Sequence, residues 1–537
     1  MRSPVKTSSF TASLSPGAVG LLAMLMLMTT ACDAIHAPIP DPAAAPKKVL
    51  RTRNPDANVS PVPAASPSPN PAPSLLPTTS AAPTTVAGIP ESPIHVKPRQ
   101  SHWLSAESSA QLTSVDLNQL STAFHDSAVT DEAFAQLLAQ QSGLPLMSTD
   151  LTAAKKLLRS LVGIRKSKLF TAPAGKVGSF DHLPNGFSNR TGIQYYLPAS
   201  VNLAEVTQPV PLLFMLHGGG DSTNTYDKAK AVSISYLKQL IPFAESAKVI
   251  IIAPSSSIGW NLQTRGLIPE IVELAQSELP IDGDRRILWG HSMGAMGITR
   301  EVGFLVGLFS GFNANNGGTQ LGYQDKRYLK TYFNTHYTHI NGLKDHFEEF
   351  LPLMRQVEAK TAALETELRL KSGFQLIVHG GTHAPDFALI SRELSKLLLQ
   401  PRDLYQKAIF PLYFGADYAG GPNSPAYPGL RVRDYFWLQS TDSLGTPLPS
   451  STLSSFEARI RGNEIDIVTQ ENALKLSHFK LLLAPELVDL TLPVIVRVDG
   501  KVTYQGIPNR NLMQLIHTAR QKKDPRFLYD AAVDLSF

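Results

Sequence analysis

The stretch Ile287-Leu-Trp-Gly-His-Ser-Met-Gly-Ala-Met-Gly297 is an apolar run that breaks abruptly into Gly290-His291-Ser292-Met293-Gly294. A GxSxG pentapeptide between a strand and a helix is typical of a sharp turn that lifts a serine hydroxyl out of the end of a sheet. The two glycines fit this interpretation, because a side chain beside such a strained turn would collide with the neighbouring strand or helix. The stretch therefore predicts that Ser292 is a nucleophile.

Apolar runs that predict buried strands lie on both sides of this turn. They cover 211–216, 248–253, 286–289 and 374–379, with an early antiparallel strand at 193–198 and another strand within 309–318. Candidate helices alternate with them at about 269–278, 293–306 and 345–360. Strands that alternate with helices favour an α/β domain in which a mostly parallel sheet is covered on both faces.

An oxyanion hole is predicted directly after the strand 211–216, where the chain reads His217-Gly218-Gly219-Gly220. Such a hole needs backbone N–H donors aimed at developing negative charge, and glycines bring bare amides close to a substrate oxygen. The amide of Met293, directly after the nucleophile, is the expected second donor.

A general base and an acid are expected after later strands. His383 is the predicted base, because it lies beyond the strand 374–379 in a glycine-containing loop, whereas the alternative, His379, still belongs to that strand. Asp345 is the predicted acid, because it follows a turn between nucleophile and base. Asp325 and Asp386 remain as alternatives, although most surface aspartates are solvated helix caps.

The chain order Ser292, Asp345, His383 resembles that of the α/β-hydrolase superfamily. The motifs HGGG, GHSMG, GLKD and GGTHAP, with 282–286 and 254–260, resemble its bacterial esterase branch, which has polyhydroxybutyrate-depolymerase-like and feruloyl-esterase-like members. The resemblance covers about residues 192–400, and similar domains occur in prolyl-oligopeptidase-type peptidases. It implies a serine hydrolase in which His383 takes the proton of Ser292 and water hydrolyses an acyl-enzyme. Trp260 is expected either to line the pocket or to be structural, and neither a cofactor nor a metal ion is expected.

The composition sets limits on the function. A chain of 537 residues with 43% hydrophobic and 17% charged residues can build two to four globular domains. The formal net charge of +5 is small for this length, and no lysine and arginine runs interleave with aromatic residues, so nucleic-acid binding is not expected. The single cysteine, Cys32, excludes any intramolecular disulfide bond and any cysteine-rich metal site.

The N-terminus has the order of an export signal. Arg2 and Lys6 precede the apolar stretch 17–28, which is too short to span a bilayer as a helix and is followed by Thr29-Thr30-Ala31-Cys32. A cysteine at this place resembles the lipidated residue of a bacterial lipoprotein, although Thr29 stands where leucine is usual. We therefore expect a signal peptide over 1–31 and a membrane-anchored envelope protein, with cleavage by an ordinary signal peptidase as the alternative.

Four further segments follow the signal. Residues 32–100 are rich in proline, alanine and serine and predict an extended tether. A helical extension is expected over 101–190, with one helix capped by Thr130 and stopped by Gly143 and another over 150–161. These helices are expected to pack on the domain that follows, with a lid over the substrate as a less favoured role.

The α/β-hydrolase domain is expected over 191–405, followed by a small antiparallel β-domain of sandwich type over 406–537. Asp499-Gly500 between two valine-rich segments predicts a hairpin turn there. The leading functional hypothesis is an exported carboxylic ester hydrolase acting on a small-molecule or polymer ester. The alternatives are a serine peptidase of the prolyl-oligopeptidase type and a non-catalytic surface binding protein, and the oligomeric state is left open.

Overall fold

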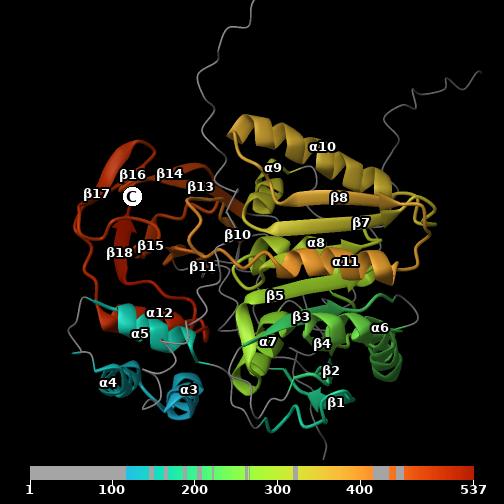
Figure 1. Cartoon of the computed structure of the whole chain (residues 1–537). Coiled ribbons are helices and arrows are strands. Elements are labelled where there is room, and N and C mark those ends of the chain that lie inside the picture. The colour runs from blue at the N-terminus through green and yellow to red at the C-terminus, as the bar shows by residue number, and fades with distance from the viewer. Residues whose placement is uncertain are drawn as a thin grey trace, which may run out of the picture. The chain divides into compact units, whose positions relative to one another are not determined.

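Figure 1 shows the computed structural model of the chain, which describes residues 116–143, 145, 150–161, 167–184, 190–201, 209–219, 223–260, 264, 266–318, 325–414, 434–442 and 453–537. All described residues belong to one compact unit of the chain, Ala87–Phe537. The predicted signal peptide and tether, including Cys32, lie outside the described residues, and so does Gly220. In the part of the chain that the structure describes, no helix is long and apolar enough to cross a membrane.

Eight strands form one sheet in the order β1-β2-β4-β3-β5-β6-β7-β8. They are β1 (Val177–His182), β2 (Thr191–Tyr196), β3 (Val210–Leu216), β4 (Ile250–Pro254), β5 (Ile281–His291), β6 (Gly311–Asn315), β7 (His336–Gly342) and β8 (Phe374–His379). The pairs β1·β2 and β2·β4 are antiparallel, and the other neighbouring pairs are parallel. With the serine turn after β5, this is the α/β-hydrolase fold, which confirms the predicted fold class.

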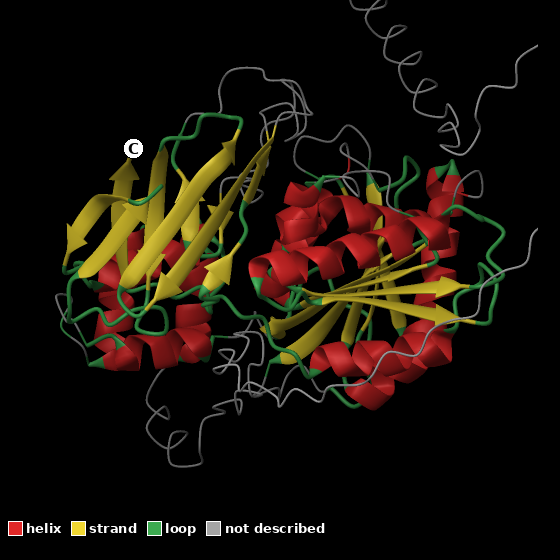
Figure 2. Ribbon diagram, turned by 90° about the horizontal axis from the view of Figure 1, so that it is seen from above, coloured by secondary structure: helices red, strands yellow, loops and turns green. Residues whose placement is uncertain are grey.

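Helices cover both faces of this sheet (Figure 2). Successive side chains of β3 point to opposite faces of the sheet and pack against different helices. Leu212 and Phe214 lie in one cluster with helices α7 (Leu267–Glu278), α8 (Met293–Leu305) and α10 (Phe350–Leu368). Leu213 and Met215 point the other way and pack with α6 (Tyr226–Ala247) and α11 (Phe387–Leu398). Because both faces are covered, the strand is apolar throughout, as the unbroken run 211–216 predicted.

Three details of this domain differ from the prediction. The sheet begins earlier than expected, because β1 pairs along its whole length with β2. The helix expected from Asp345 begins only at Phe350, because residues 343–349 form turns. A short helix α9 (Lys326–Leu329) and a 3-10 turn η4 (Lys330–Phe333) lead into β7.

The C-terminal part contains two further sheets that share one buried cluster. The first sheet contains β9 (Ala408–Ile409), β10 (Leu412–Phe414), β13 (Leu453–Arg461), β14 (Glu464–Asn472), β16 (Val494–Val498) and β17 (Lys501–Gly506). The second contains β11 (Asp434–Tyr435), β12 (Leu438–Ser440), β15 (His478–Leu483) and β18 (Ala531–Ser536). Phe456 and Phe479 meet edge to face at 5.0 Å between their ring centroids, so the sheets pack against each other.

The pairing in these two sheets is antiparallel, as expected, with the exception of β14·β16, which is parallel. The predicted hairpin turn joins β16 to β17, and both of its residues have positive φ, 48° at Asp499 and 81° at Gly500. Two consecutive positive φ values are the mark of the tight turn that suits the twist of a hairpin. This local prediction is confirmed.

The N-terminal helices pack on the C-terminal part, and the prediction that they pack on the domain that follows them is wrong. They are α3 (Leu117–His125), α4 (Asp131–Ser142) and α5 (Thr152–Arg159), and they lie next to α12 (Leu512–Gln521), as Figure 1 shows. Phe134 and Leu138 of α4 share a buried cluster with Leu515 and Ile516 of α12. The predicted caps are present, since Thr130 accepts a hydrogen bond from the Ala133 amide and Gly143 has φ 69°.

A buried cluster of charged side chains joins β5 to the segment that follows α12. The Asp524 carboxylate contacts the Arg402 guanidinium at 2.7 Å and that of Arg286 at 3.1 Å. Burial alone would raise the pKa of Asp524, but Arg402 and Arg286 beside it lower that pKa well below its usual value. Asp284 completes the cluster by pairing with Arg402 and with Arg526.

Candidate active site

Ser292 lies in the turn between β5 and α8 with φ 53° and ψ −116°, outside the regions that L-residues usually adopt. The glycines on either side are required by close packing. A Cβ at Gly290 would lie 2.6 Å from the carbonyl carbon of Gly294, and a Cβ at Gly294 would lie 2.2 Å from the carbonyl oxygen of Leu216. The Ser292 amide donates to the Asn315 carbonyl at 2.8 Å, which ties the strained turn to β6.

The structure brings Ser292, His383 and Asp345 into one chain of hydrogen bonds. The imidazole of His383 contacts the Ser292 hydroxyl through Nε2 at 2.9 Å and the Asp345 carboxylate through Nδ1 at 2.9 and 3.0 Å. Because a carboxylate only accepts, Nδ1 carries the proton, and Nε2 is left to accept the hydroxyl proton of the serine. The Asp345 side chain is only 3% exposed, so the charge sits in a sheltered place.

The acid turn and the base loop are held together through their backbones. The Leu343 amide donates to the His379 carbonyl at 2.8 Å, and the Lys344 amide donates to the Gly381 carbonyl at 2.9 Å. Gly342 is where the two segments come closest, because a Cβ there would lie 2.4 Å from the Thr382 carbonyl oxygen. The distance between acid and base is therefore fixed by main-chain contacts.

The alternative residues lie elsewhere and have other partners. Asp325 caps α9 and pairs with Arg327 at 2.7 Å, and Asp386 caps α11 through two backbone amides. His379, at the end of β8, accepts the Gly381 amide at its Nδ1 at 3.3 Å. None of these contacts reaches Ser292.

Asn316, which the sequence did not single out, connects all parts of this arrangement. It has φ 48°, its side-chain amide donates to the His383 carbonyl at 3.0 Å, and its side-chain oxygen accepts the Gly342 amide at 2.8 Å. Its own amide donates to the Ile340 carbonyl at 2.8 Å. One side chain directly after β6 thus positions the acid turn and the base loop. The run Asn315-Asn316-Gly317-Gly318 was the available signal for a tight turn.

His291, the residue before the nucleophile, also supports the base loop. Its Nε2 donates to the His383 carbonyl at 2.7 Å, and its Nδ1 accepts the Tyr236 hydroxyl at 2.7 Å. Burial lowers the pKa of His291 to about 4, so the ring stays neutral and keeps this pattern of one donor and one acceptor. His291 is a positioning residue that holds the base loop through its hydrogen bond to the His383 carbonyl.

The predicted oxyanion loop follows β3 and is organised by the His217 ring. Nδ1 of this ring donates to the Gly218 carbonyl at 2.8 Å, and Nε2 accepts the Ser256 amide at 3.0 Å. Burial lowers the pKa of His217 to about 4, which keeps the ring neutral. The imidazole is therefore occupied in holding the loop, and only backbone amides of this segment are available to a substrate.

Glycine at position 218 is required, because a Cβ there would lie 2.8 Å from Nδ1 of His291. A Cβ at Gly219 would meet the hydroxyl of Thr223 at 2.3 Å. Met293 is the first residue of α8, where a backbone N–H has no acceptor within the helix. The amides of Gly218, Gly219 and Met293 are therefore the candidate oxyanion donors next to Ser292.

Trp260 supports this loop from behind. Trp260 is 2% exposed, and its Nε1 donates to the His217 carbonyl at 2.9 Å. A Cβ at Gly297 would lie 2.4 Å from the Cβ of Trp260, so glycine is needed at that position. Of the two roles expected for Trp260, the structure places it in the structural one.

Aromatic rings surround the imidazole of His383 on the solvent side. The centroids of His346, Phe347 and Phe350 lie 4.9, 4.7 and 6.2 Å from that of His383. Phe347 is 38% exposed, so it forms part of the surface beside His383. All three residues lie within or directly after the acid turn, and the sequence prediction missed them because apolar residues at 347 and 350 fit an ordinary helix face.

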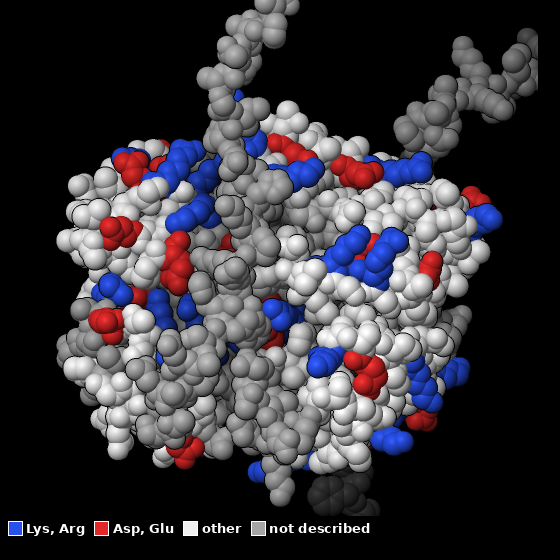
Figure 3. Space-filling view, in the orientation of Figure 1, with Lys and Arg blue, Asp and Glu red and all other residues white. Residues whose placement is uncertain are grey.

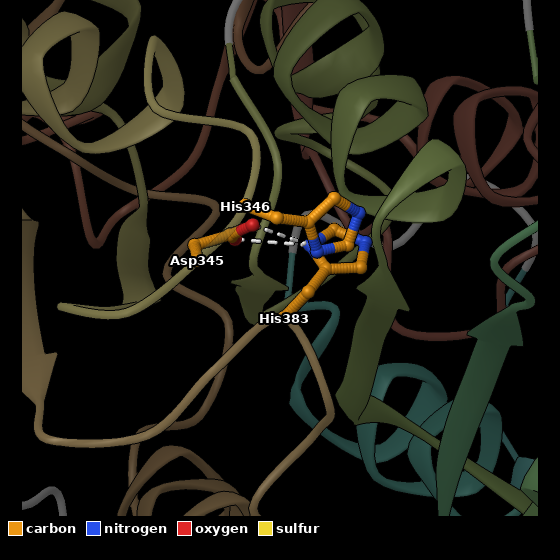
Figure 4. A group of neighbouring side chains, drawn as sticks. All are labelled: Asp345, His346 and His383. Carbon is orange, nitrogen blue, oxygen red and sulfur yellow. Dashed lines mark hydrogen bonds and ion pairs between the residues drawn. The ribbon is translucent and has the colours of Figure 1, made fainter.

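One group of described residues has the donor atoms of a metal site. Asp345, His346 and His383 each offer one ligand atom, and these atoms lie within 4.8 Å of one another. Figure 4 shows the ring of His346 lying against that of His383, next to the carboxylate of Asp345.

A separate cavity of about 140 Å³ lies at the opposite end of the sheet. It is lined by residues that precede the parallel strands, such as Ser310 before β6, His336 at the start of β7 and Gly373 before β8. Ser292 and His383 follow the other ends of their strands, so this cavity is remote from the hydrogen-bond chain.

Comparisons with known proteins gave structural matches alone. No family model matches, and no curated protein matches by sequence. Solved structures that match over about two fifths of the chain include a fluorophosphonate-binding serine hydrolase of Staphylococcus aureus (16% identity, 42% of this chain and 99% of that one, TM-score 0.33). A poly(3-hydroxybutyrate) depolymerase of Bordetella parapertussis also matches (16%, 41% and 94%, TM-score 0.32). A third match is a Bacteroides ovatus protein proposed to be a dipeptidyl aminopeptidase IV (13%, 42% and 36%, TM-score 0.32). These similarities are too low to assign an activity, so the function has to be argued from the site.

Proposed function

We propose that this protein is a serine hydrolase that cleaves carboxylic esters through an acyl-enzyme on Ser292. The observation that carries the proposal is the hydrogen-bond chain from the Ser292 hydroxyl through His383 to the buried Asp345 carboxylate. A serine in a strained turn is weakly nucleophilic by itself, and an adjacent imidazole oriented by a carboxylate is the arrangement that activates it.

The proposed reaction has two steps. In the first, Nε2 of His383 takes the hydroxyl proton while Oγ of Ser292 attacks the ester carbonyl, and the same proton then leaves with the alcohol. In the second, His383 activates a water molecule that cleaves the acyl-serine ester. Asp345 stabilises the imidazolium that forms in both steps, and the amides of Gly218, Gly219 and Met293 stabilise the oxyanion.

An ester substrate is favoured over a peptide by the elements before the sheet. In the described residues that precede β1, the structure contains only the three helices α3, α4 and α5. These three helices pack on α12. They do not form the enclosing N-terminal domain that a prolyl-oligopeptidase-type peptidase would use. A purely non-catalytic binding protein is disfavoured because serine, base and acid are all in bonding geometry.

The proposed substrate is a small-molecule or polymer ester, and the proposed location is the bacterial envelope. We propose that residues 1–31 are an export signal and that Cys32 carries the lipid anchor, on the sequence argument given above. On the face seen in Figure 3, lysines and arginines are interspersed with aspartates and glutamates among the described residues. Replacement of Cys32 by serine should release the protein from the membrane fraction; unchanged sedimentation with membranes would contradict the anchor.

The serine is tested with p-nitrophenyl acetate and butyrate. Ser292→Ala should lower kcat by about a millionfold, because the base and the acid act only through this nucleophile. The measurement is the initial rate at saturating ester, with Ser310→Ala as a matched control of a buried serine at the other end of the sheet. Activity that survives Ser292→Ala, or that disappears in Ser310→Ala with the fold intact, would refute the assignment.

The acid is tested separately. Asp345→Asn keeps the size of the side chain but lets the imidazole settle in the wrong tautomer, so kcat should fall by about ten-thousandfold while the folded structure is kept. Asp386→Asn, a helix cap near the same loop, is the control and should lose only stability, by about 1 kcal/mol or less. A near-wild-type rate for Asp345→Asn would place the acid elsewhere.

A further inference from the structure

We propose that Asp345, His346 and His383 bind a divalent transition-metal ion such as Zn²⁺, and that this ion reversibly switches the hydrolase off. The geometry points to this inference because the three side chains converge from the acid turn and the base loop. Two imidazoles and one carboxylate are a donor set that Zn²⁺ favours, with a fourth position left for water. The inhibitory effect rests on the proposed hydrolase function, whereas the binding of the metal does not.

The distances are within the reach of small side-chain movements. The three ligand atoms lie within 4.8 Å of one another, while ligands about 2.0–2.1 Å from a tetrahedral zinc ion are roughly 3.4 Å apart. Nδ1 of His383 and the Asp345 carboxylate are 2.9 Å apart, so this pair has to open by about 0.5 Å to admit the ion, while His346 is drawn in. His346 is exposed, and its ring already lies beside that of His383.

The bound metal ion would prevent His383 from acting as the general base. In the free enzyme the proton of His383 is on Nδ1, which faces Asp345, and the lone pair of Nε2 accepts the serine proton. If zinc takes Nδ1, that proton moves to Nε2 through solvent, and Nε2 loses its acceptor lone pair. If zinc takes Nε2 instead, the same lone pair is used in the metal bond. Either outcome leaves Ser292 without a proton acceptor.

His346 is the residue that distinguishes this site from an ordinary triad. It stands outside the hydrogen-bond chain that joins Ser292, His383 and Asp345, and its ring only touches that of His383 at 4.9 Å between centroids. Loss of its imidazole should therefore remove one metal ligand and leave the proton-transfer groups in place. A substitution here separates metal binding from catalysis.

The experiment measures binding and turnover on the full chain at one fixed pH. ZnCl₂ is titrated by isothermal calorimetry into wild type, His346→Ala and His478→Ala, and p-nitrophenyl butyrate hydrolysis is followed over the same zinc range and again after EDTA. His478 is the matched control, because it is exposed like His346 and has a carboxylate beside it, since its Nδ1 contacts Asp442 at 2.6 Å.

Wild type and His478→Ala are expected to bind zinc at this site and to lose activity that EDTA restores. His346→Ala should keep its basal rate within about threefold and need roughly tenfold more zinc, or higher, for both binding and inhibition. Equal zinc affinity and inhibition in wild type and His346→Ala would overturn the proposal. Zinc bound through His346 in a protein that hydrolyses no ester would refute the proposed function and leave the metal site standing.

Discussion

Asn316 shows how one side chain can decide the geometry of a catalytic site that it does not join. Its amide donates to the His383 carbonyl and its oxygen accepts the Gly342 amide, so the loop of the base and the turn of the acid are fixed to each other. Both contacts involve backbone atoms of segments that follow different strands. A small displacement of either segment moves His383 relative to the hydroxyl of Ser292 and lowers the rate, since catalysis depends on near-attack distances.

The Asn316→Asp variant tests this positioning role. Aspartate tolerates positive φ and can still accept the Gly342 amide, but it cannot donate to His383 and its charge repels that carbonyl. We expect kcat to fall about 10- to 100-fold with little change in KM. Steady-state kinetics with p-nitrophenyl butyrate measure the split; a change in KM alone would show that Asn316 acts on substrate binding instead.

Buried histidines make the stability of the molecule depend on pH. Burial lowers the pKa of His125, His217, His291 and His339 to about 4, while unfolded histidine titrates near 6.5. Between these two values the unfolded chain binds more protons than the folded chain, so unfolding is favoured as the pH falls. Each group contributes a slope of at most about 1.4 kcal/mol per pH unit.

We therefore expect the free energy of unfolding to be greatest above pH 6.5 and to decrease as the pH falls towards 4. Urea unfolding followed by fluorescence at pH 7, 6 and 5 measures the slope. A His339→Asn variant should be less stable at every pH but have a shallower slope, by the equivalent of one proton. A free energy of unfolding that is flat between pH 7 and pH 5 would contradict these pKa values.

At the scale of elements, the contact between the acid turn and the base loop depends on a glycine. Gly342→Ala would put a Cβ 2.4 Å from the Thr382 carbonyl oxygen and should push the two segments apart, with a loss of about 100-fold or more in kcat/KM. Gly380→Ala is the matched control in the same loop, because a Cβ there meets nothing within 4 Å. Equal effects of the two variants would show that general loop stiffness, and not this contact, is responsible.

The elements that the sequence predicted are those specified by local pattern. The run 211–216 forms β3, residues 374–379 form β8, and the pair Asp499-Gly500 forms its turn, because periodicity and φ preference act over a few residues. The start of α10 was misplaced, since residues 343–349 have a helix-compatible composition but form turns, the first of which is bonded to the base loop through Leu343 and Lys344. Tertiary contacts override propensity there.

The same distinction applies to the candidate site. Ser292, Asp345 and His383 could be selected because each follows a recognisable strand in the order of a known fold, and the structure brings these three together. The tasks of Asn316 and His291 could not be predicted, because they consist of hydrogen bonds to backbone atoms 26, 67 and 92 positions further along the chain. Nothing local in either residue specifies such a partner.

At the scale of the whole molecule, the buried charges around Asp524 connect the catalytic sheet to the C-terminal part. Asp524→Ala would leave the guanidinium groups of Arg286 and Arg402 buried with less compensation, and we expect a loss of about 3–5 kcal/mol in the free energy of unfolding. The neighbouring Lys523→Ala, which removes an exposed pair with Glu273, should cost about 1 kcal/mol or less. Similar losses for both variants in urea unfolding would contradict the role given to the buried cluster.

The packing of α4 on α12 has a consequence for how the chain is made. Phe134 and Leu138 leave the ribosome before any residue of the catalytic sheet, but their partners Leu515 and Ile516 are translated only after it is complete. Until then α4 is covered only by α3 and α5, and the apolar side chains that pack on α12 stay exposed, a state in which chains aggregate or need a chaperone. Shortening the chain before α12 therefore damages its beginning as well as its end.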